Sequence, residues 1–302
     1  MATGNFRLNR CWQERARLTG PLALLLVCLA STAFRAQSEP TQTVVERMHA
    51  YLDAYEPKLS ELVADEAFVQ RLRPPGEGVN GESVGPRYAS SRRLESDIGF
   101  LRLPGRLGWL AQRSVRAIDG VSIATAEQRL DQVYASSRGD LLSRARGIAE
   151  GNARHNLGHP RSINVPTLPL ELLGRQHAAA FDVRLEGRER VLGRDSVRVL
   201  FRERAPGGIV AYDERRAMRA DLRAWIAAAD GAVLRAIVEL DAPGWGGGHS
   251  IRTDFAPDPQ LGILVPVRLE ERWEVPRRGV GVATYGNYRK FQTAGRILPP
   301  GR

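Results

Sequence analysis

The feature that most constrains the fold is a long series of short segments in which apolar and polar residues alternate. Between residues 181 and 291, apolar side chains recur at every second position in one segment after another, which is the period of a half-buried β-strand. Two connections carry the pairs Asp119-Gly120 and Asp230-Gly231 between β-forming residues, and such pairs favour tight hairpins because they tolerate positive φ. Short turns between successive strands predict an antiparallel meander.

The same pattern places further strands ahead of this series and predicts few helices. The expected strands are 67–73, 94–100, 109–118, 181–185, 197–201, 222–226, 233–240, 251–255, 263–273 and 280–291. A helical insert is expected at about 125–158, from capping residues at Thr125 and Asp140 and the breakers Gly158 and Pro160. The fold class is therefore mainly β with helices (α+β).

One amphipathic helix is expected before the first strand. Thr43-Val44-Val45-Glu46 has capping-box spacing, and apolar residues from Val44 to Val63 recur at helical spacing. Pro57 would kink this helix or restart it. The apolar stripe has to be buried against another element, and the sheet is the expected partner.

Residues 1–36 have the layout of an export signal. A polar, basic stretch precedes the apolar run Leu22–Ala30, which is too short to span a bilayer comfortably but suits the core of a signal peptide. Small residues predict cleavage near Ala33 or Ala36, and an uncleaved anchor is the alternative. We therefore expect an exported protein of the periplasm or cell envelope, with one β domain over 37–302.

Composition excludes several classes of function. The only cysteines, Cys11 and Cys28, lie in the export segment, so the remainder offers no disulfide, thiol nucleophile or Cys-ligated metal. Lys+Arg is 44 against Asp+Glu 34, a net charge of +10, but the arginines alternate with apolar residues along strands. That pattern is typical of a solvated strand face and argues against nucleic-acid binding; weak attraction to an anionic membrane surface fits it better.

Motifs for catalysis or metal binding are sparse. His155 and His159 have metal-like spacing, but no Glu follows the first, and the breakers favour a solvated helix end over a metal site. The Gly-rich stretch at 244–248 precedes no helix, so it is not a phosphate cradle. No Gly-x-Ser-x-Gly nucleophile elbow is present. No metal, cofactor or catalytic residue is predicted.

Paired carboxylates give a sharper structural expectation. Asp65 is adjacent to Glu66, and Glu270 to Glu271, so on a strand the members of each pair point to opposite faces. Two carboxylates facing one another, as glycosidases need, cannot be read from such spacing. For Asp97 and for Arg92, an ion pair with a neighbouring strand is the expected role.

Five segments carry a resemblance to known bacterial proteins. The hairpin Ala224–Arg235 resembles the "W-I-D-x-x-T-G-x-V-L-R" hairpin of outer-membrane lipoprotein-sorting (LolA/LolB-like) proteins, and Asp254–Val267 resembles their "Y-x-x-x-x-x-x-G-x-x-x-P" strand pair. Leu62–Glu66, Arg92–Asp97 and Asn164–Leu168 are similar to the "LVAEE", "R-x-L-x-S-D" and "N-x-P-T-L" motifs of an uncharacterised family of bacterial secreted proteins. Ala227 departs from the sorting proteins, which usually carry Asp there.

The resemblance implies a curved antiparallel sheet, an incomplete barrel, with helices covering its concave face. In the carriers that concavity holds acyl chains, and no catalytic residues come with it. The aromatic and helix-stripe residues expected to bind a lipid-like or apolar ligand are Trp225, Phe255, Trp273, Phe291, Met48, Tyr51 and Tyr55.

Three classes of function stay open at this stage. The first is a non-enzymatic binder or carrier of lipid-like ligands in the envelope. The second is a module that binds another envelope protein, and the third is a hydrolase with an unrecognised site. An apolar cavity would favour the first, and convergent polar side chains with shifted pKa values would favour the third. No motif indicates the ligand or the oligomeric state.

Overall fold

The computed structural model describes residues 40–74, 88–102, 109–123, 147, 150–204, 209–213, 216–241 and 248–290. The chain divides after Pro40, and everything below concerns the second unit. The predicted export signal, Phe291 and most of the insert expected at 125–158 lie outside the described residues. Within that insert, residues 150–153 are helical and turns follow at once, so the helix ends several residues before Gly158.

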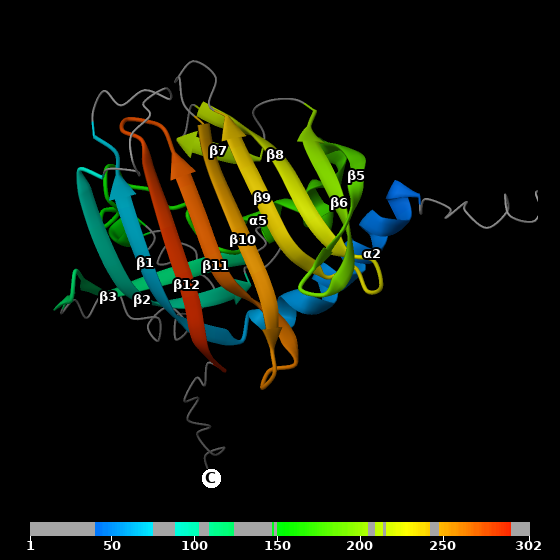
Figure 1. Ribbon diagram of the computed structural model, residues 1–302, viewed down its shortest axis with the longest axis horizontal. Coiled ribbons are helices and arrows are strands. Elements are labelled where there is room, and N and C mark those ends of the chain that lie inside the picture. Colours follow the sequence, from blue (N-terminus) through cyan, green and yellow to red (C-terminus); the bar gives the residue numbers. More distant parts are fainter. Residues whose placement is uncertain are drawn as a thin grey trace, which may run out of the picture. The chain divides into compact units, whose positions relative to one another are not determined.

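One antiparallel sheet dominates the fold (Figure 1). Its strands are β1 (Leu62–Leu72), β2 (Ser90–Arg102), β3 (Trp109–Ile118), β4 (Val121–Ser122), β5 (Phe181–Val191), β6 (Arg194–Glu203), β7 (Val210–Asp213), β8 (Arg216–Ala227), β9 (Val233–Asp241), β10 (Gly248–Asp258), β11 (Ile263–Trp273) and β12 (Gly279–Lys290). Their order is β4-β3-β2-β1-β12-β11-β10-β9-β8-β6-β5, with β7 paired to β8. The end strands β4 and β5 do not pair, so the sheet is open.

The expected strands and both Asp-Gly hairpins are confirmed. Asp119-Gly120 joins β3 to β4 and Asp230-Gly231 joins β8 to β9, with positive φ at Asp119, Gly120 and Gly231. From β5 to β12 the sheet follows chain order. Strand β1 departs from chain order because it pairs with the last strand, β12, as well as with β2. It therefore connects the N-terminal strands to the C-terminal strand.

The helices lie on one face of this sheet. Helix α2 (Thr41–Leu59) and helix α5 (Leu168–Leu172) pack there, followed by the 3₁₀ helix η3 (Arg175–Ala180). Figure 1 shows α2 passing behind the strands, while β2 and β3 run across the direction of β9 and β10. A sheet bent around helices was expected, and the described helices cover its inner face only in part. The irregular segment 154–167 covers another part, near β1 and β11.

Helix α2 differs from the expectation at both ends. It begins at Thr41, so the predicted capping box at Thr43 lies inside the helix. It continues through Pro57 and ends at Leu59 rather than restarting, because a proline in the last turn removes few helical hydrogen bonds. Leu62 and Val63, which fit the helical period, are the first residues of β1; pairing with β2 and β12 decides their conformation.

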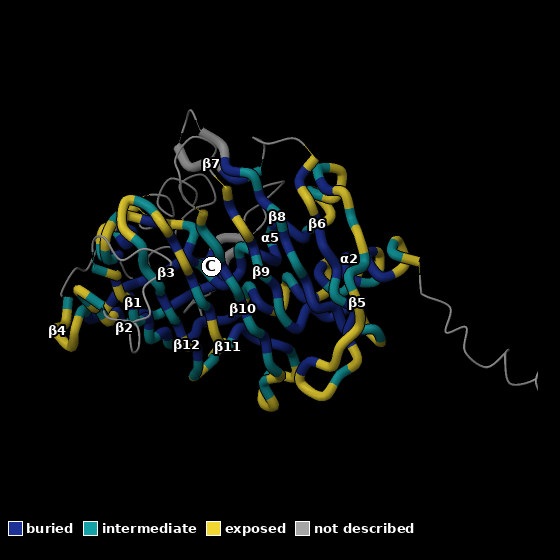
Figure 2. The backbone as a smooth tube through the Cα atoms, turned by 45° about the horizontal axis from the view of Figure 1, so that its top comes forward, coloured by how far each residue is buried: buried dark blue, intermediate teal, exposed yellow. Residues whose placement is uncertain are grey.

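Strand alternation separates two faces, here called the inner face, which carries the helices, and the outer face. Inner residues such as Phe68, Leu222 and Leu269 are completely buried. Each such side chain stabilises the fold by about 1.5–3 kcal/mol. Buried residues lie along the central strands, whereas residues of the hairpin tips and of β4 are exposed (Figure 2). The core thus lies between α2, α5 and the inner face.

Candidate functional site

A cleft of about 650 Å³ opens between the N-terminal half of α2 and the edge strand β5. We call it the α2–β5 cleft. Its lining comes from five elements and the residues next to them: Thr41, Gln42, Val45, Glu46 and His49 of α2; Leu172, Leu173 and Gly174 at the end of α5; Ala178 and Ala179 of η3; Phe181, Asp182 and Val183 of β5; and Phe201 of β6 with Arg204 just after it. Its volume is typical of small-molecule sites.

The floor of the cleft follows from strand alternation. Phe181 and Val183 of β5 are two residues apart and share the inner face, and Val183 pairs with Phe201 of β6. The rings of Phe181 and Phe201 meet edge to face, with centroids 6.3 Å apart, a preferred aromatic arrangement. Because β5 is an edge strand, α2 does not extend its apolar cover over the whole floor, and this leaves an apolar-lined opening.

The roof of the cleft is held by charged residues at its rim. Arg175 of η3 bonds to Glu46 at 2.8 Å and lies 3.4 Å from Asp53, both on α2. The hydrogen bond from Arg175 lowers the pKa of Glu46. These side chains are about half exposed, so solvent screens each pair and its contribution to stability is small. They tie η3 to the helix without closing the cleft.

His49 is the titratable group inside the cleft. Its side chain is 3% exposed, and its Nδ1 has no hydrogen-bond partner among the described residues. Burial, reinforced by the nearby Arg175, lowers the pKa of His49. The imidazole is therefore neutral at pH 7 and adds little polarity to the lining.

A second cluster of interest lies deeper, on the inner face near β1 and β11. Glu66 of β1 and Arg113 of β3 form a two-pronged ion pair, with the Nη2–Oε1 distance 2.8 Å. Arg113 also donates to the side chain of Asn164 at 3.1 Å and to its carbonyl at 2.9 Å. Burial lowers the pKa of Arg113, but the contact with Glu66 outweighs it and the net pKa is raised.

A matching pair completes this cluster. Arg161 donates to Glu271 of β11 at 2.7 Å and lies over the ring of Trp273, 3.8 Å from its centroid. Burial raises the pKa of Glu271, but His249, whose Nε2 lies 3.0 Å from Oε1, and the charge of Arg161 bring it down to about 2. Asn164 donates to Glu271 at 3.3 Å and so connects the two ion pairs.

We call these five residues (Glu66, Arg113, Arg161, Asn164 and Glu271) the buried ion network. Each has a relative exposure of 6% or less. Every charge has an opposite partner, and the segment that carries Arg161 and Asn164 is irregular backbone. Buried pairs with complete hydrogen bonding hold a unique geometry more than they add stability. The network fastens segment 154–167 onto the sheet.

The adjacent-carboxylate expectation is confirmed by this cluster. Glu66 and Glu271 face inward into the network. Their neighbours Asp65 and Glu270 pair with outer-face arginines, Arg289 and Arg272. Two of the family-like motifs also meet here, because Glu66 ends the first and Asn164 begins the last. Sequence could not connect residues a hundred positions apart.

Other single-residue expectations have mixed outcomes. Asp97 lies 3.6 Å from Arg116 on the neighbouring strand β3, as expected. Arg92 instead donates to the carbonyl of His155. His155 and His159 are partly buried rather than solvated, since the segment packs on the sheet; burial and Arg161 lower the pKa of His159 to about 4.

The structure disperses the residues expected to bind an apolar ligand. Met48 and Tyr55 of α2 and Phe255 of β10 are packed in the core, at 0%, 3% and 2% exposure. The Tyr55 hydroxyl donates to the carbonyl of Leu264 on β11, and Tyr51 stacks on Tyr55 with centroids 5.3 Å apart.

The remaining three expected residues lie elsewhere. Trp273 is on the inner face beneath Arg161. Trp225 is on the outer face, because the inner positions of β8 are Leu222 and Ala224 and a strand alternates. Its indole N–H donates to Glu189, and Arg235 covers its ring. Phe291 lies outside the described residues.

None of the six described residues is part of the α2–β5 cleft. The floor residues Phe181, Val183 and Phe201 were recognisable from alternation as inward-facing. The sequence did not show that these residues border an opening, because the opening depends on how far α2 reaches across the edge of the sheet.

Together these observations define an open antiparallel sheet that carries a helix and a cleft with an apolar floor on its inner face. In the part of the chain that the structure describes, no helix is long and apolar enough to cross a membrane. There, too, no three His, Cys, Asp or Glu side chains gather as ligands for a metal ion.

Solved structures with a similar arrangement include lipoprotein-sorting proteins. One is a putative outer membrane lipoprotein-sorting protein domain from Vibrio parahaemolyticus, at 8% identity and a TM-score of 0.42, covering 86% of this chain and 95% of the other. A second is the LolA superfamily protein NE2245 from Nitrosomonas europaea, at 14% identity and a TM-score of 0.32, covering 86% and 94%.

A DUF1329 family protein from Desulfovibrio piger is similar at 12% identity and a TM-score of 0.37, covering 84% of this chain and 94% of the other. No family model and no curated protein sequence matches this chain.

Proposed function

We propose that this protein is an exported cell-envelope protein that binds a lipid-like or otherwise apolar ligand in the α2–β5 cleft, without catalysing a reaction on it. The observation that carries the proposal is the lining of the cleft. Phe181, Val183 and Phe201 form the floor and Val45 part of the roof, and charged groups stay at the rim. Apolar sites with a few polar groups at the mouth are typical of ligand pockets.

The neutral state of His49 supports an apolar ligand over a charged one. A buried cation in the lining would favour an anionic group, but the lowered pKa leaves the ring uncharged at neutral pH. At the mouth, Arg204 and Glu46 remain solvated, so they can accompany the polar end of an amphiphile. The ligand would insert its apolar portion between α2 and β5.

The test uses cis-parinaric acid, a fluorescent long-chain fatty acid, with residues 37–302. Ala178 is an exposed small residue at the mouth, and Ala178→Trp would fill it. The matched control is Ala54→Trp, an exposed alanine on α2 outside the lining. We expect saturable binding that Ala178→Trp weakens by about 10-fold or more and Ala54→Trp leaves unchanged, because a filled pocket excludes its ligand. Equal effects of both variants, or no saturable binding, would refute the proposal.

Native mass spectrometry gives an independent result. Protein purified from membranes should carry co-purifying lipid, and the Ala178→Trp protein should carry less. Repeatedly clean apo protein would contradict the proposal.

Export is part of the same proposal and has its own measurement. The basic stretch and apolar run of residues 1–36 support a cleaved signal. The intact mass of the protein recovered from cells should correspond to a new N-terminus after Ala33 or Ala36. A full-length mass in the membrane fraction would indicate a retained anchor.

A further inference from the structure

The outer face of the sheet carries three triads in which two arginines share one carboxylate. Arg202 and Arg219 lie 3.6 and 3.3 Å from Asp221. Arg252 lies 3.0 Å from Asp254, which also accepts from Arg235. Glu270 accepts from both Arg268 and Arg272. We call the six arginines (Arg202, Arg219, Arg235, Arg252, Arg268 and Arg272) the arginine array.

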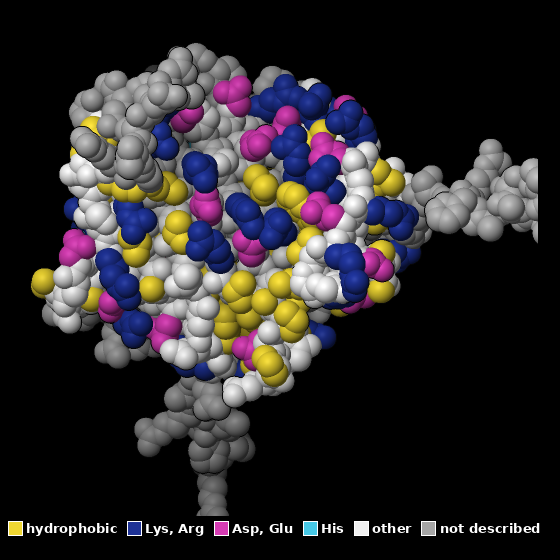
Figure 3. Space-filling view, viewed as in Figure 1, with side chains coloured by type: hydrophobic (Ala, Val, Ile, Leu, Met, Phe, Trp, Pro, Cys, Tyr) yellow, Lys and Arg dark blue, Asp and Glu magenta, His cyan; other side chains and the backbone are white. Residues whose placement is uncertain are grey.

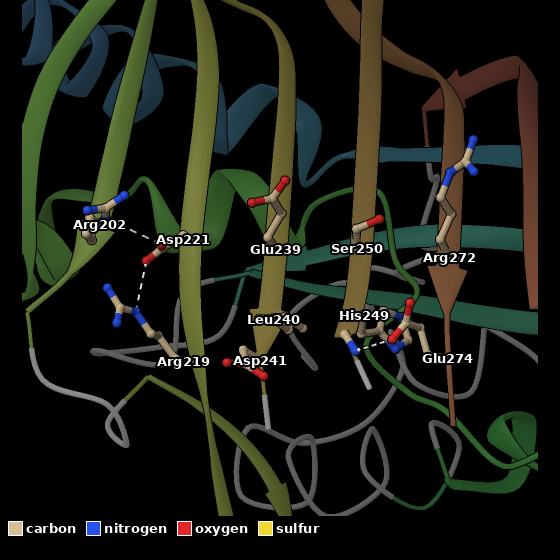
Figure 4. A pocket seen from close by; sticks show the side chains of 11 residues that line it. Arg202, Arg219, Asp221, Glu239, Leu240, Asp241, His249, Ser250, Arg272 and Glu274 are labelled. Atoms are coloured by element: carbon tan, nitrogen blue, oxygen red, sulfur yellow. Dashed lines mark hydrogen bonds and ion pairs between the residues drawn. The ribbon is translucent and has the colours of Figure 1, made fainter. Parts of the chain in front are cut away.

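Strand register places the array on one continuous surface. Arg235 of β9 pairs with Asp254 of β10, which pairs with Arg268 of β11. Residues paired across strands share a face. The array extends from β6 to β11 over five neighbouring strands, a width of about 20 Å at the usual strand spacing. Blue side chains occupy the middle of this face in Figure 3, and Figure 4 shows Arg202 and Arg219 both reaching Asp221.

The carboxylates lie deeper than the guanidinium groups. Asp221, Asp254 and Glu270 are 25%, 18% and 20% exposed, whereas Arg202 and Arg272 reach 59% and 66%. A guanidinium has five N–H donors, and the shared carboxylates use only some of them. The more deeply placed carboxylates therefore fix the positions of the guanidinium groups, whose unused N–H donors face solvent.

The array keeps a surplus of positive charge. Six arginines share three carboxylates. Glu239, which lies among them, pairs with Arg223 at 3.2 Å and does not neutralise the array. Asp241 lies opposite Arg219 in the register and offsets one charge at the strand end. Glu274, which lines the same surface beside Arg272, pairs with Arg278, so two positive charges of the array remain.

We propose that the arginine array docks this protein on an anionic membrane surface. Protein-binding hot spots combine arginine with tryptophan and tyrosine, but the aromatic residue among the described residues of this surface, Trp225, is 7% exposed and covered by Arg235. A broad, cationic face without such a residue matches a plane of phosphate groups, which guanidinium groups bind well. The cleft is on the inner face, so this docking is independent of the apolar-ligand proposal.

The test is co-sedimentation of residues 37–302 with vesicles. One set contains phosphatidylcholine alone, and the other an equimolar mixture of phosphatidylcholine and phosphatidylglycerol. We expect binding to the anionic vesicles only, lost near 1 M salt because the screening length falls to about 3 Å. Arg268→Gln/Arg272→Gln should weaken binding by about 25-fold, at roughly 5-fold for each charge removed.

Matched variants separate the array from net charge. Lys58→Gln/Arg154→Gln removes the same charge from exposed positions off the outer-face strands and should change binding by less than about 3-fold. Arg268→Lys/Arg272→Lys keeps the charge and should bind within about 3-fold of the parent. Cis-parinaric acid binding in vesicle-free buffer should be the same in every one of these variants, so the two proposals can fail separately.

Three outcomes would overturn the docking proposal. The first is equal binding to both kinds of vesicle, and the second is an equal loss in the array variant and in the charge-matched control. The third is binding to soluble polyglutamate but not to anionic vesicles, which would indicate an acidic protein partner instead.

Discussion

Replacing Arg161 by methionine tests whether the buried ion network holds segment 154–167 on the sheet. Arg161 and Glu271 have side-chain exposures of 2% and 0%, and 2.7 Å separates their bonded atoms. The change keeps an apolar side chain of similar reach over Trp273 but leaves Glu271 without its main cation. Removing one member of a buried pair typically costs 3–5 kcal/mol because the other charge stays buried.

The pKa of Glu271 gives a second measure of the same effect. It falls from 4.5 to about 2 through the close contact of His249 and the charge of Arg161. A change of this size corresponds to about 3 kcal/mol of stabilisation, which His249 and Arg161 share. Because the pKa is lower in the folded state, this stabilisation is present above pH 4.5 and is lost as the pH falls toward 2. We therefore expect Arg161→Met to lower the free energy of unfolding by about 3–5 kcal/mol at pH 7.

Urea unfolding followed by tryptophan fluorescence measures this difference between pH 3 and pH 7. It should be largest at pH 7 and shrink below pH 4.5. Arg272→Met is the control, because its pair with Glu270 is at the surface and Arg272 is 66% exposed; it should cost less than about 1 kcal/mol. The double variant Arg161→Met/Glu271→Leu should be less destabilised than Arg161→Met alone, since no unpaired charge remains. A loss at pH 7 similar to the control, or one independent of pH, would refute the reasoning.

Two further changes test the packing of neighbouring elements. The pKa of His159, measured by NMR titration, should be about 4; since the unfolded ring binds its proton more readily, stability should fall as the pH drops from about 6.5 toward 4, and His159→Gln should remove that part of the fall. A measured pKa near 6.5 would show a solvated ring. Gly231→Ala should cost clearly more than Gly120→Ala in thermal unfolding: both have positive φ, at about 1–2 kcal/mol for an added Cβ, but only at Gly231 would that Cβ overlap the backbone of Arg47 on α2. Equal losses would show that α2 does not rest on this turn.

Much of the fold could be predicted because its signals are local. Alternation marked the strands, and the Asp-Gly pairs marked two hairpins. Alternation also assigned Glu66 and Glu271 to the face opposite their neighbours. The same rule places Trp225 on the face opposite Ala224, so its position on the outer face could have been read from the sequence. The prediction placed Trp225 in a cavity because it is aromatic, although its position in the alternating pattern assigned it to the opposite face.

The errors at the ends of α2 have a different cause. Leu59, Leu62 and Val63 satisfy a helical period, but they also fit the beginning of a strand. Local pattern cannot choose between the two. Pairing of β1 with strands on both sides makes the choice, since a central strand gains two sets of hydrogen bonds.

For the candidate sites, too, some features follow from local sequence patterns and others only from the tertiary structure. Local periodicity in the sequence was sufficient for the strands, the tight turns and the face on which each side chain lies. Only tertiary structure decided that β1 enters between the first and last hairpins, and that Glu66 and Asn164 meet at Arg113. It also decided that α2 leaves the floor of the cleft open beside β5. Periodicity is a property of neighbouring residues, whereas an ion network or a cleft depends on contacts between elements distant in the chain.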